Sequence, residues 1–183
     1  CNYIHLPVQS GSSRILKKMN RGYSRSEYIK LIDNIKKHIP DCGISMDIIA
    51  GFCSESEKDH LDTLSLMDYV QYDYGYMFKY SERPNTKAAR TMTDDVPEKI
   101  KQRRLEEIIK KQQEHSLINL QKKIGNIYEV LVENISKKSS KYLYGRTTHN
   151  SAVVFKGDNK LIGQYVDVKI LDCTSATLKG KIV

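Results

Sequence analysis

Residues 44–52 read ISMDIIAGF, a short apolar run bounded by residues that favour turns. A run of this length is too short for a typical helix, and its continuous apolar character is typical of a strand buried on both faces of a parallel sheet. Asp47 is the one charged residue within it, and a carboxylate in such a strand needs a partner. The stretch therefore predicts a central strand of an α/β domain with one polar position.

Amphipathic helices are predicted on both sides of this strand. Ser24 with Glu27 three residues later forms a capping box before one helix, which Pro40 and Gly43 bring to an end. Ser56 with Asp59 caps the helix that follows the strand. The residues that we expect to point inward are Tyr28, Ile32, Ile35 and Ile39 in the first helix, and Leu61, Leu64 and Met67 in the second.

Two further strands are predicted at residues 3–8 and 72–80, so that strands and helices alternate along the first half of the chain. This alternation is typical of βα units around a parallel sheet. In the third strand, tyrosines recur at alternate positions on one face, and packing is the first explanation for them. These tyrosines are Tyr72, Tyr74, Tyr76 and Tyr80.

The second half of the chain has a different pattern. Asp95 and Pro97 begin a long helix that we expect to run to Gly125, with one apolar face and one solvated face rich in Lys and Arg. Beyond it, only short strands are predicted, at residues 128–134, 142–148, 152–155, 165–171 and 177–183. Five short strands in about sixty residues fit a small closed or partly open barrel. We therefore expect an α/β region at residues 1–96, a connecting helix at 97–125 and an all-β domain at 126–183.

Composition narrows the class of partner. The 183 residues carry a formal net charge of +8, which favours a polyanion such as RNA. No apolar stretch approaches the roughly 20 residues that a membrane helix requires, so we expect a cytoplasmic protein. The four cysteines are widely spaced and form no C-x-x-C pair, which is against a zinc site or a redox motif.

Polar residues collect where the predicted strands end, which is where parallel α/β sheets bind their ligands. The first strand runs into Gln9 and Ser10, and the second into a segment that contains Glu55. The third ends in residues 79–86, KYSERPNT, which include Arg83. We expect a ligand site at this edge.

Several motifs in this order carry a family resemblance: HLPVQSGS (residues 5–12), MNRGYS (19–24), DIIAGF (47–52), YSERPNT (80–86) and DDVP (94–97). Together they resemble the catalytic barrel of the methylthiotransferase branch of the radical S-adenosylmethionine (SAM) enzymes. The all-β tail is similar to the TRAM domain, an RNA-binding barrel, through GRT (145–147) and TSATLKG (174–180). The chain departs from the family pattern at Cys53-Ser54, where proline and glycine are usual, and at Asn85, where glycine is common.

The resemblance implies SAM and 4Fe–4S clusters as the cofactors of the intact enzyme. It implies that Gln9, Ser10, Asp47 and Glu55 line the SAM side of the site, with Arg83 over its mouth. The family's C-x-x-x-C-x-x-C loop, which holds the cluster, has no counterpart in this chain. We therefore expect a C-terminal part of an enzyme, inactive alone and without a bound cofactor, whose incomplete barrel exposes an edge through which it self-associates.

For the tail, the resemblance implies contact with the tRNA anticodon stem-loop. Arg146 is the strongest candidate for RNA binding, because it lies near Tyr144, His149 and Asn150. Lys137, Lys138 and Lys141 are expected to extend the basic surface.

The implied activity of the whole enzyme is addition of a methylthio group to carbon 2 of an isopentenylated adenosine beside the anticodon. Two alternatives stay open. One is a sibling enzyme that acts on a ribosomal-protein aspartate or on threonylcarbamoyladenosine, and the other is a non-catalytic RNA-binding module.

Overall fold

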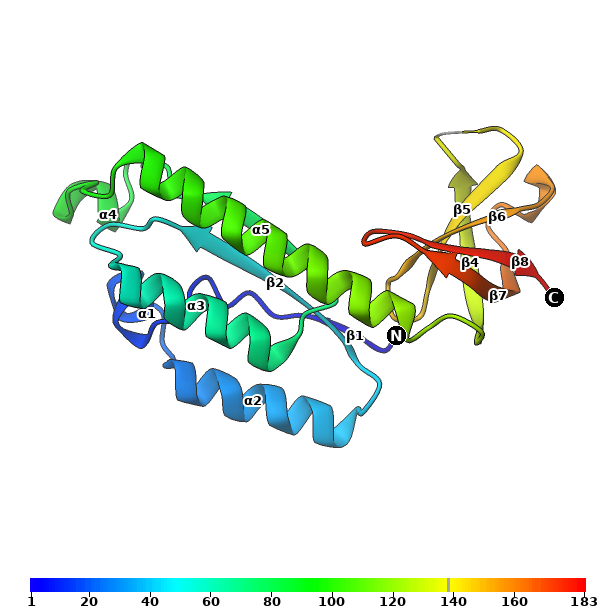
Figure 1. Cartoon of the computed structure of the whole chain (residues 1–183), viewed down its shortest axis with the longest axis horizontal. Coiled ribbons are helices and arrows are strands. Elements are labelled where there is room, and N and C mark those ends of the chain that lie inside the picture. Colours follow the sequence, from blue (N-terminus) through cyan, green and yellow to red (C-terminus); the bar gives the residue numbers. More distant parts are fainter. Residues whose placement is uncertain (138) are drawn as a thin grey trace. The chain divides into compact units, whose positions relative to one another are not determined.

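The computed structural model describes residues 1–137 and 139–183. It contains a three-stranded sheet with helices alongside it, a long helix and a five-stranded barrel (Figure 1). The fold class predicted from sequence is therefore confirmed. By its internal contacts the chain forms two compact units, one of residues 5–40 and 44–112, the other of residues 1–4, 41–43 and 113–183.

The sheet has the strand order β1-β2-β3, with β1 at Tyr3–His5, β2 at Gly43–Ala50 and β3 at Tyr74–Lys79. β2 and β3 are parallel, and an isolated parallel bridge between Gln9 and Ile48 continues the pairing of the first strand segment beyond β1. Met46, Ile48 and Ala50 of β2 are almost fully buried. The central, parallel β2 matches the strand that its apolar run predicts.

The predicted helix caps form as expected. α2 (Arg25–His38) and α3 (Glu57–Val70) both begin with complete capping boxes, at Ser24 with Glu27 and at Ser56 with Asp59. Two short helices, α1 (Ser13–Lys18) and α4 (Lys87–Thr91), were not predicted. They occupy only one or two turns, which is too short to show a hydrophobic period.

The predicted inward face of α3 was wrong in part. Leu61 is 55% exposed, whereas Thr63, Leu66, Met67 and Val70 are buried. These four follow the helical spacing i, i+3, i+4, i+7, and Leu61 lies outside that stripe. In α2, Tyr28 and Ile32 are buried as predicted, but Ile39 is 40% exposed because it stands at the C-cap, where the helix has ended.

The tyrosines near β3 divide between core and surface. Tyr72 is fully buried, but Tyr74 and Tyr76 are about half exposed, as is Phe78 on the same face of the strand. Packing therefore explains Tyr72 and does not explain the other two.

The long helix α5 spans Glu98–Gln121, and Gly125 follows it with a φ of +89°, which suits glycine. We predicted a solvated charged face, and this is wrong for Lys101 and Arg104, which are each only 4% exposed. Lys101 pairs with Asp94 at 2.5 Å, and Arg104 pairs with Glu55 at 3.0 Å. Burial is tolerated because each cation meets a carboxylate.

The barrel is closed, with the strand order β4-β5-β6-β8-β7. Its strands are β4 (Ile127–Ile135), β5 (Tyr142–Thr147), β6 (Ala152–Lys156), β7 (Tyr165–Cys173) and β8 (Leu178–Ile182), with a short 3₁₀ turn η1 at Asn159–Leu161. All five predicted strands are present. The core consists of Leu120, Val130, Val132, Leu143, Val153, Phe155, Val168, Ile170 and Leu178.

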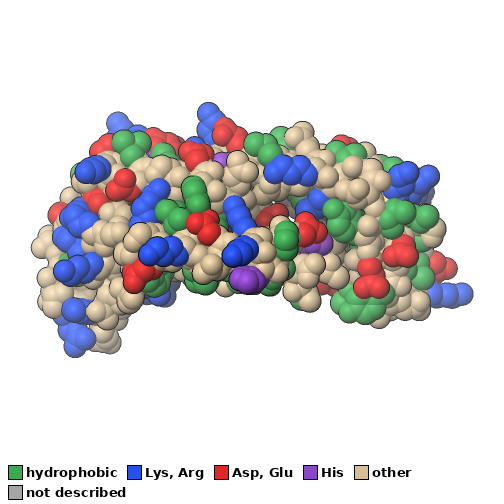
Figure 2. Space-filling view, turned by 90° about the horizontal axis from the view of Figure 1, so that it is seen from below, with side chains coloured by type: hydrophobic (Ala, Val, Ile, Leu, Met, Phe, Trp, Pro, Cys, Tyr) green, Lys and Arg blue, Asp and Glu red, His purple; other side chains and the backbone are tan. Residues whose placement is uncertain are grey.

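Lys and Arg recur across the face shown in Figure 2, with Asp and Glu among them. Among the helices of residues 1–137 and 139–183, none has the length and apolar character that crossing a membrane requires.

Candidate functional site

A cavity of about 510 Å³ lies at the carboxyl ends of the three parallel strands. Its size is in the usual range for a small-molecule site. Gln9 and Asp47 supply polar groups, and apolar side chains supply much of the rest. The apolar lining residues are Met19, Ile49, Phe52, Phe78 and Ala88.

Cations are numerous around the same cavity. Lys18 follows from α1, Arg21 from the turn after it, Arg83 from the loop after β3 and Lys87 from the start of α4. No ion pair of these four side chains is found within the described residues. Their positive charges therefore favour an anionic or hydrogen-bonding ligand in the cavity.

Gln9 has an unusual backbone conformation, with a φ of +67°. Its N–H donates to the Asp47 carbonyl at 2.8 Å and its carbonyl accepts from the Ile49 N–H at 3.0 Å. These two bonds hold Gln9 against β2 in a conformation that is uncommon outside glycine. Strained backbone of this kind often marks a functional position.

Asp47 lies on the open face of β2 beside His5. Asp47 Oδ1 is 3.5 Å from His5 Nε2, and His5 Nδ1 is 2.7 Å from the Ser45 hydroxyl. The His5 ring also meets the Tyr76 ring edge to face, with centroids 6.2 Å apart. His5 lies in an apolar strand, yet its side chain is 38% exposed. The alternation of β1 could have placed it on the open face, had the register been known.

Ser10 and Glu55 do not line this cavity. The Ser10 hydroxyl is 3.4 Å from that of Thr63 and accepts from the Ser12 N–H at 3.2 Å. Gly11 beside it faces α3, since a Cβ there would lie 2.5 Å from the Asp62 carbonyl oxygen. Glycine is therefore required at this position for the close approach of a helix backbone.

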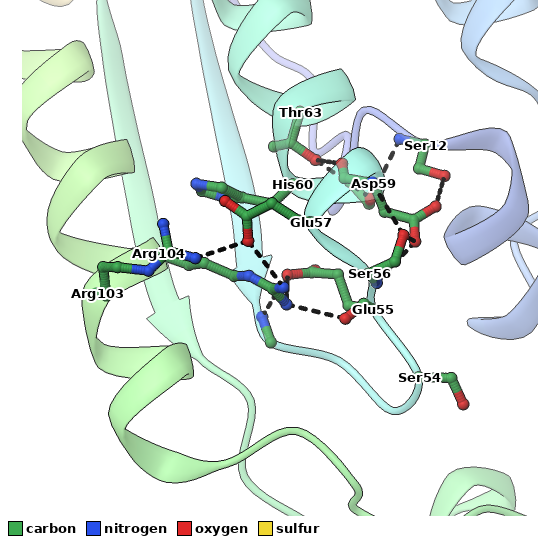
Figure 3. A network of polar contacts seen from close by, with 12 residues as sticks. Ser12, Ser54, Glu55, Ser56, Glu57, Asp59, His60, Thr63, Arg103 and Arg104 are labelled. Atoms are coloured by element: carbon green, nitrogen blue, oxygen red, sulfur yellow. Dashed lines mark hydrogen bonds and ion pairs between the residues drawn. The ribbon is translucent and has the colours of Figure 1, made fainter.

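Glu55 belongs to a buried ion-pair network (Figure 3). Its Oε1 accepts from the Gly51 N–H and from Arg104, both at 3.0 Å, and Arg104 also donates to the Glu55 carbonyl at 2.9 Å. Burial raises the pKa of Glu55, although the Gly51 N–H and Arg104 oppose it. The side chain thus ties the loop after β2 to α5.

A second carboxylate, Asp59, fixes the start of α3 (Figure 3). Its Oδ1 accepts from the Ser12 hydroxyl at 2.6 Å, its Oδ2 from the Ser56 N–H at 2.8 Å, and Arg14 forms an ion pair with it. Burial disfavours ionisation of Asp59, but the bonds from Arg14, Ser12 and Ser56 outweigh it and hold its pKa well below the usual range.

At Asn85, in the loop after β3, the backbone conformation fits the residue that replaces the family's usual glycine. Asn85 has a φ of +66°, and Ser54 in the segment after β2 has a φ of +61°. Both positions are those at which glycine is usual in the family that the sequence resembles. Asn tolerates this conformation better than most residues.

No metal centre is formed by the described residues. Cys53 is buried, Cys42 and Cys173 are partly exposed and Cys1 is exposed, and no three His, Cys, Asp or Glu side chains gather in residues 1–137 and 139–183. A 4Fe–4S cluster needs several thiolates around one site. The cysteines of this chain do not fit one.

The RNA-binding residues predicted from sequence lie on the barrel. Arg146 contacts Asn150 Oδ1 at 2.8 Å and Glu133 Oε2 at 3.3 Å. His149, which we grouped with it, is buried and points to Asp41 at 2.8 Å instead. Two of the predicted lysines, Lys137 and Lys141, are exposed between β4 and β5, and Lys138 lies outside the described residues.

Comparison with known proteins agrees with these parts. Residues 1–67 match the Radical SAM superfamily, and residues 121–183 match the TRAM domain. Over 99% of its length the chain is 62% identical to a tRNA-2-methylthio-N(6)-dimethylallyladenosine synthase of Christiangramia forsetii, of which it covers 38%. It is 55% identical over its full length to the synthase of Flavobacterium johnsoniae, again 38% of that protein. The chain thus spans about two-fifths of the relatives it matches, and the resemblance found in the sequence is confirmed.

The Asp59 contacts lead to a pH-dependent prediction. We expect Asp59→Asn to lower the free energy of unfolding at pH 7 by about 2 kcal/mol, because the amide cannot replace a carboxylate in the ion pair with Arg14. The folded pKa is depressed, so this contribution is complete above the usual Asp value of about 3.9 and is lost as the pH falls below it. Urea denaturation at pH 7 and pH 3 measures it.

Asp62→Asn is the matched control, because Asp62 lies in the same helix as Asp59. Within the described residues, no hydrogen bond or ion pair of its carboxylate is found. This substitution should leave the unfolding free energy nearly unchanged at both pH values. An Asp59→Asn effect as large at pH 3 as at pH 7 would contradict the electrostatic explanation.

Proposed function

We propose that this chain, which joins part of a radical SAM domain to a TRAM domain, belongs to an enzyme that methylthiolates tRNA. The intact enzyme would add the methylthio group to carbon 2 of N6-isopentenyladenosine next to the anticodon. The names of the relatives support this substrate.

One observation carries the proposal: the cavity at the carboxyl ends of β1, β2 and β3 lies in the α/β region and presents polar groups over an apolar lining. An adenosine-based cofactor needs an apolar surface for its ring and hydrogen-bonding groups for its hydroxyls. Gln9 and Asp47 are suited to the second task, and Phe52 and Phe78 to the first. We propose these residues as the SAM contacts, with Arg83 over the mouth.

Ser10 and Glu55 act differently in this proposal. They position the site, Ser10 through α3 and Glu55 through Arg104. Direct contact of these two residues with SAM stays a prediction from the sequence. The cluster that would supply the electron for cleavage of SAM is assigned to a part of the enzyme that this chain does not span. Bound SAM would provide the radical chemistry, and this chain would bind and orient it.

The RNA-binding role is assigned to residues 126–183, following the α/β region at 1–96 and the connecting helix at 97–125. Residues 124–183 contain nine Lys and Arg against five Asp and Glu, which gives a net charge of +4. This favours phosphate contacts. We propose Arg146 with Lys137, Lys138 and Lys141 as contacts to the anticodon stem-loop, and a cytoplasmic location where tRNA is found.

The catalytic part is tested in a full-length enzyme that contains this sequence. We expect Asp47→Asn to reduce SAM binding and formation of the 2-methylthio product by at least about tenfold, because a charge-assisted hydrogen bond is lost. Mass spectrometry of the tRNA nucleosides measures the product, and equilibrium dialysis measures SAM.

Asp62→Asn serves again as control and should retain activity. If Asp47→Asn binds SAM and forms product as the unaltered enzyme does, the cofactor assignment is wrong. If the product carries the group on a protein aspartate or on threonylcarbamoyladenosine, the enzyme is the sibling type.

The RNA-binding part is tested with the chain itself and an anticodon stem-loop over a series of salt concentrations. We expect Arg146→Ala to weaken binding more than Lys137→Ala or Lys141→Ala, because a guanidinium binds phosphate and stacks on a base. The slope of log affinity against log salt should fall by up to about one unit. If Arg146→Ala leaves affinity and slope unchanged while Lys137→Ala or Lys141→Ala abolishes binding, the RNA-binding site lies in the turn between β4 and β5 instead.

Self-association is proposed through the open face of the sheet near β3, whose partner is a second copy of the chain. β3 is an edge strand, and Tyr74, Tyr76 and Phe78 expose about half of their surface there. Light scattering should give a mass that rises with concentration above 21.1 kDa.

Tyr74→Lys should reduce this association, and Leu61→Lys on α3 is matched to it in exposure at 55% against 51%. A monomer at all concentrations, or equal effects of the two substitutions, would count against the proposal.

A further inference from the structure

Three side chains of β5 point away from the barrel core in a row. Tyr142, Tyr144 and Arg146 alternate with Leu143, which is fully buried, and Gly145, whose Cβ would lie 2.4 Å from the Leu131 carbonyl oxygen. The closeness of the β4 backbone at Gly145 fixes which side faces inward. The three long side chains are therefore held on the outer surface.

Each of the two tyrosine rings has a cation beside it. Lys156 Nζ lies 5.9 Å from the centroid of the Tyr142 ring, and Arg146 Cζ lies 5.9 Å from that of Tyr144. Strand register explains both contacts, because Tyr142 is paired with Lys156 across to β6 and Arg146 follows Tyr144 by two residues. We name Tyr142, Tyr144, Arg146 and Lys156 the tyrosine strip.

On the side of β6 and β8, the neighbours of the strip are small or basic. Val154 and Ala152 of β6 are the partners of Tyr144 and Arg146, and Lys179 of β8 is the next partner beyond Val154. Tyr144 is partly exposed beside these short side chains. Lys179 adds a positive charge nearby, although it is paired with Asp172 at 2.8 Å.

The positive charge of Arg146 is partly balanced by neighbouring side chains. Its Nε is shared with Glu133 and its NH1 with Asn150, so part of its charge is balanced and its position beside Tyr144 is fixed. The tyrosine strip therefore presents flat aromatic and guanidinium surfaces more than it presents unbalanced positive charge. Single-stranded RNA supplies flat bases, and aromatic and guanidinium planes are the groups on which proteins stack them.

We propose that the tyrosine strip binds single-stranded RNA by stacking bases on Tyr142 and Tyr144, with Arg146 and Lys156 flanking the stack. The inference rests on the proposed RNA-binding role of the barrel and adds the chemistry of recognition to it. A protein partner is disfavoured because the cations beside the rings suit an anionic ligand. Phosphate contact and base stacking differ in their salt dependence, and this makes the proposal testable.

The test uses the whole 183-residue chain with a labelled single-stranded RNA and a duplex of the same sequence. Tyr144→Ala and Tyr142→Ala should each weaken binding of the single strand by about tenfold, because each removes one stacking surface. The salt slope should stay unchanged, since no phosphate contact is lost. The duplex, whose bases are already stacked, should be bound more weakly and be less affected.

Tyr165→Ala is the matched control. Tyr165 is 64% exposed on β7, which is two strands away from β5 around the closed barrel, and through Leu131 it is in register with Arg146 rather than with either tyrosine of the strip. It should not change binding.

A second measurement does not depend on the stability of the alanine variants. The chain contains no tryptophan, so Tyr144→Trp introduces a single one. Its fluorescence should be quenched when single-stranded RNA binds, and that of Tyr165→Trp should not be.

The outcomes separate the two proposals. If the chain binds RNA but Tyr144→Ala and Tyr142→Ala behave like Tyr165→Ala, or if Tyr144→Trp is not quenched, base stacking is overturned and the RNA-binding role stands. A fall in the salt slope with an equal loss for the duplex overturns it as well, because the strip would then contact phosphates. If the unaltered chain binds no RNA, the RNA-binding role itself fails.

Discussion

The buried contact between Arg104 and Glu55 is the constraint on which the geometry of the α/β region depends. Both side chains are almost inaccessible to solvent, and the carboxylate also accepts the Gly51 N–H at the end of β2. A buried ion pair adds little net stability, but removing one partner leaves an unpaired charge at a cost of about 3–5 kcal/mol. The pair therefore dictates one arrangement of the loop after β2 more than it strengthens the fold.

That loop begins at the strand that carries Asp47, and it continues into the α3 cap. Asp59 then connects α3 to Ser12 and Arg14, which follow Gln9. Two carboxylates thus link α5, β2, α3 and the segment after β1 through side chains that do not line the cavity. The sequence motif around Glu55 is explained by this linkage, and ligand contact is not needed to account for it.

How much the sequence predicts depends on how local the cause is. The capping boxes at Ser24 and Ser56, the strand at residues 44–52 and the five barrel strands follow from neighbouring residues, and all of them are present. Burial of Arg104 could not be predicted, because Arg104 meets a carboxylate 49 residues away. Without that partner, a basic helix face is most simply interpreted as solvated.

The candidate site shows the same division. The family resemblance implied Gln9 and Asp47 as site residues, and both side chains line the cavity. The role of Gly11 depends on the approach of α3, and the exposure of His5 on the register of β1. Neither is visible to a local pattern.

The barrel illustrates how register creates a surface that composition does not reveal. Tyr142 and Lys156 are 14 positions apart and meet only because β5 and β6 pair antiparallel with these residues opposite each other. A shift of one residue would turn both tyrosines into the core and bring Leu143 to the surface. The same pairing that buries Leu143 and Phe155 therefore places the aromatic rings outside, and core formation and the outer aromatic row have one cause.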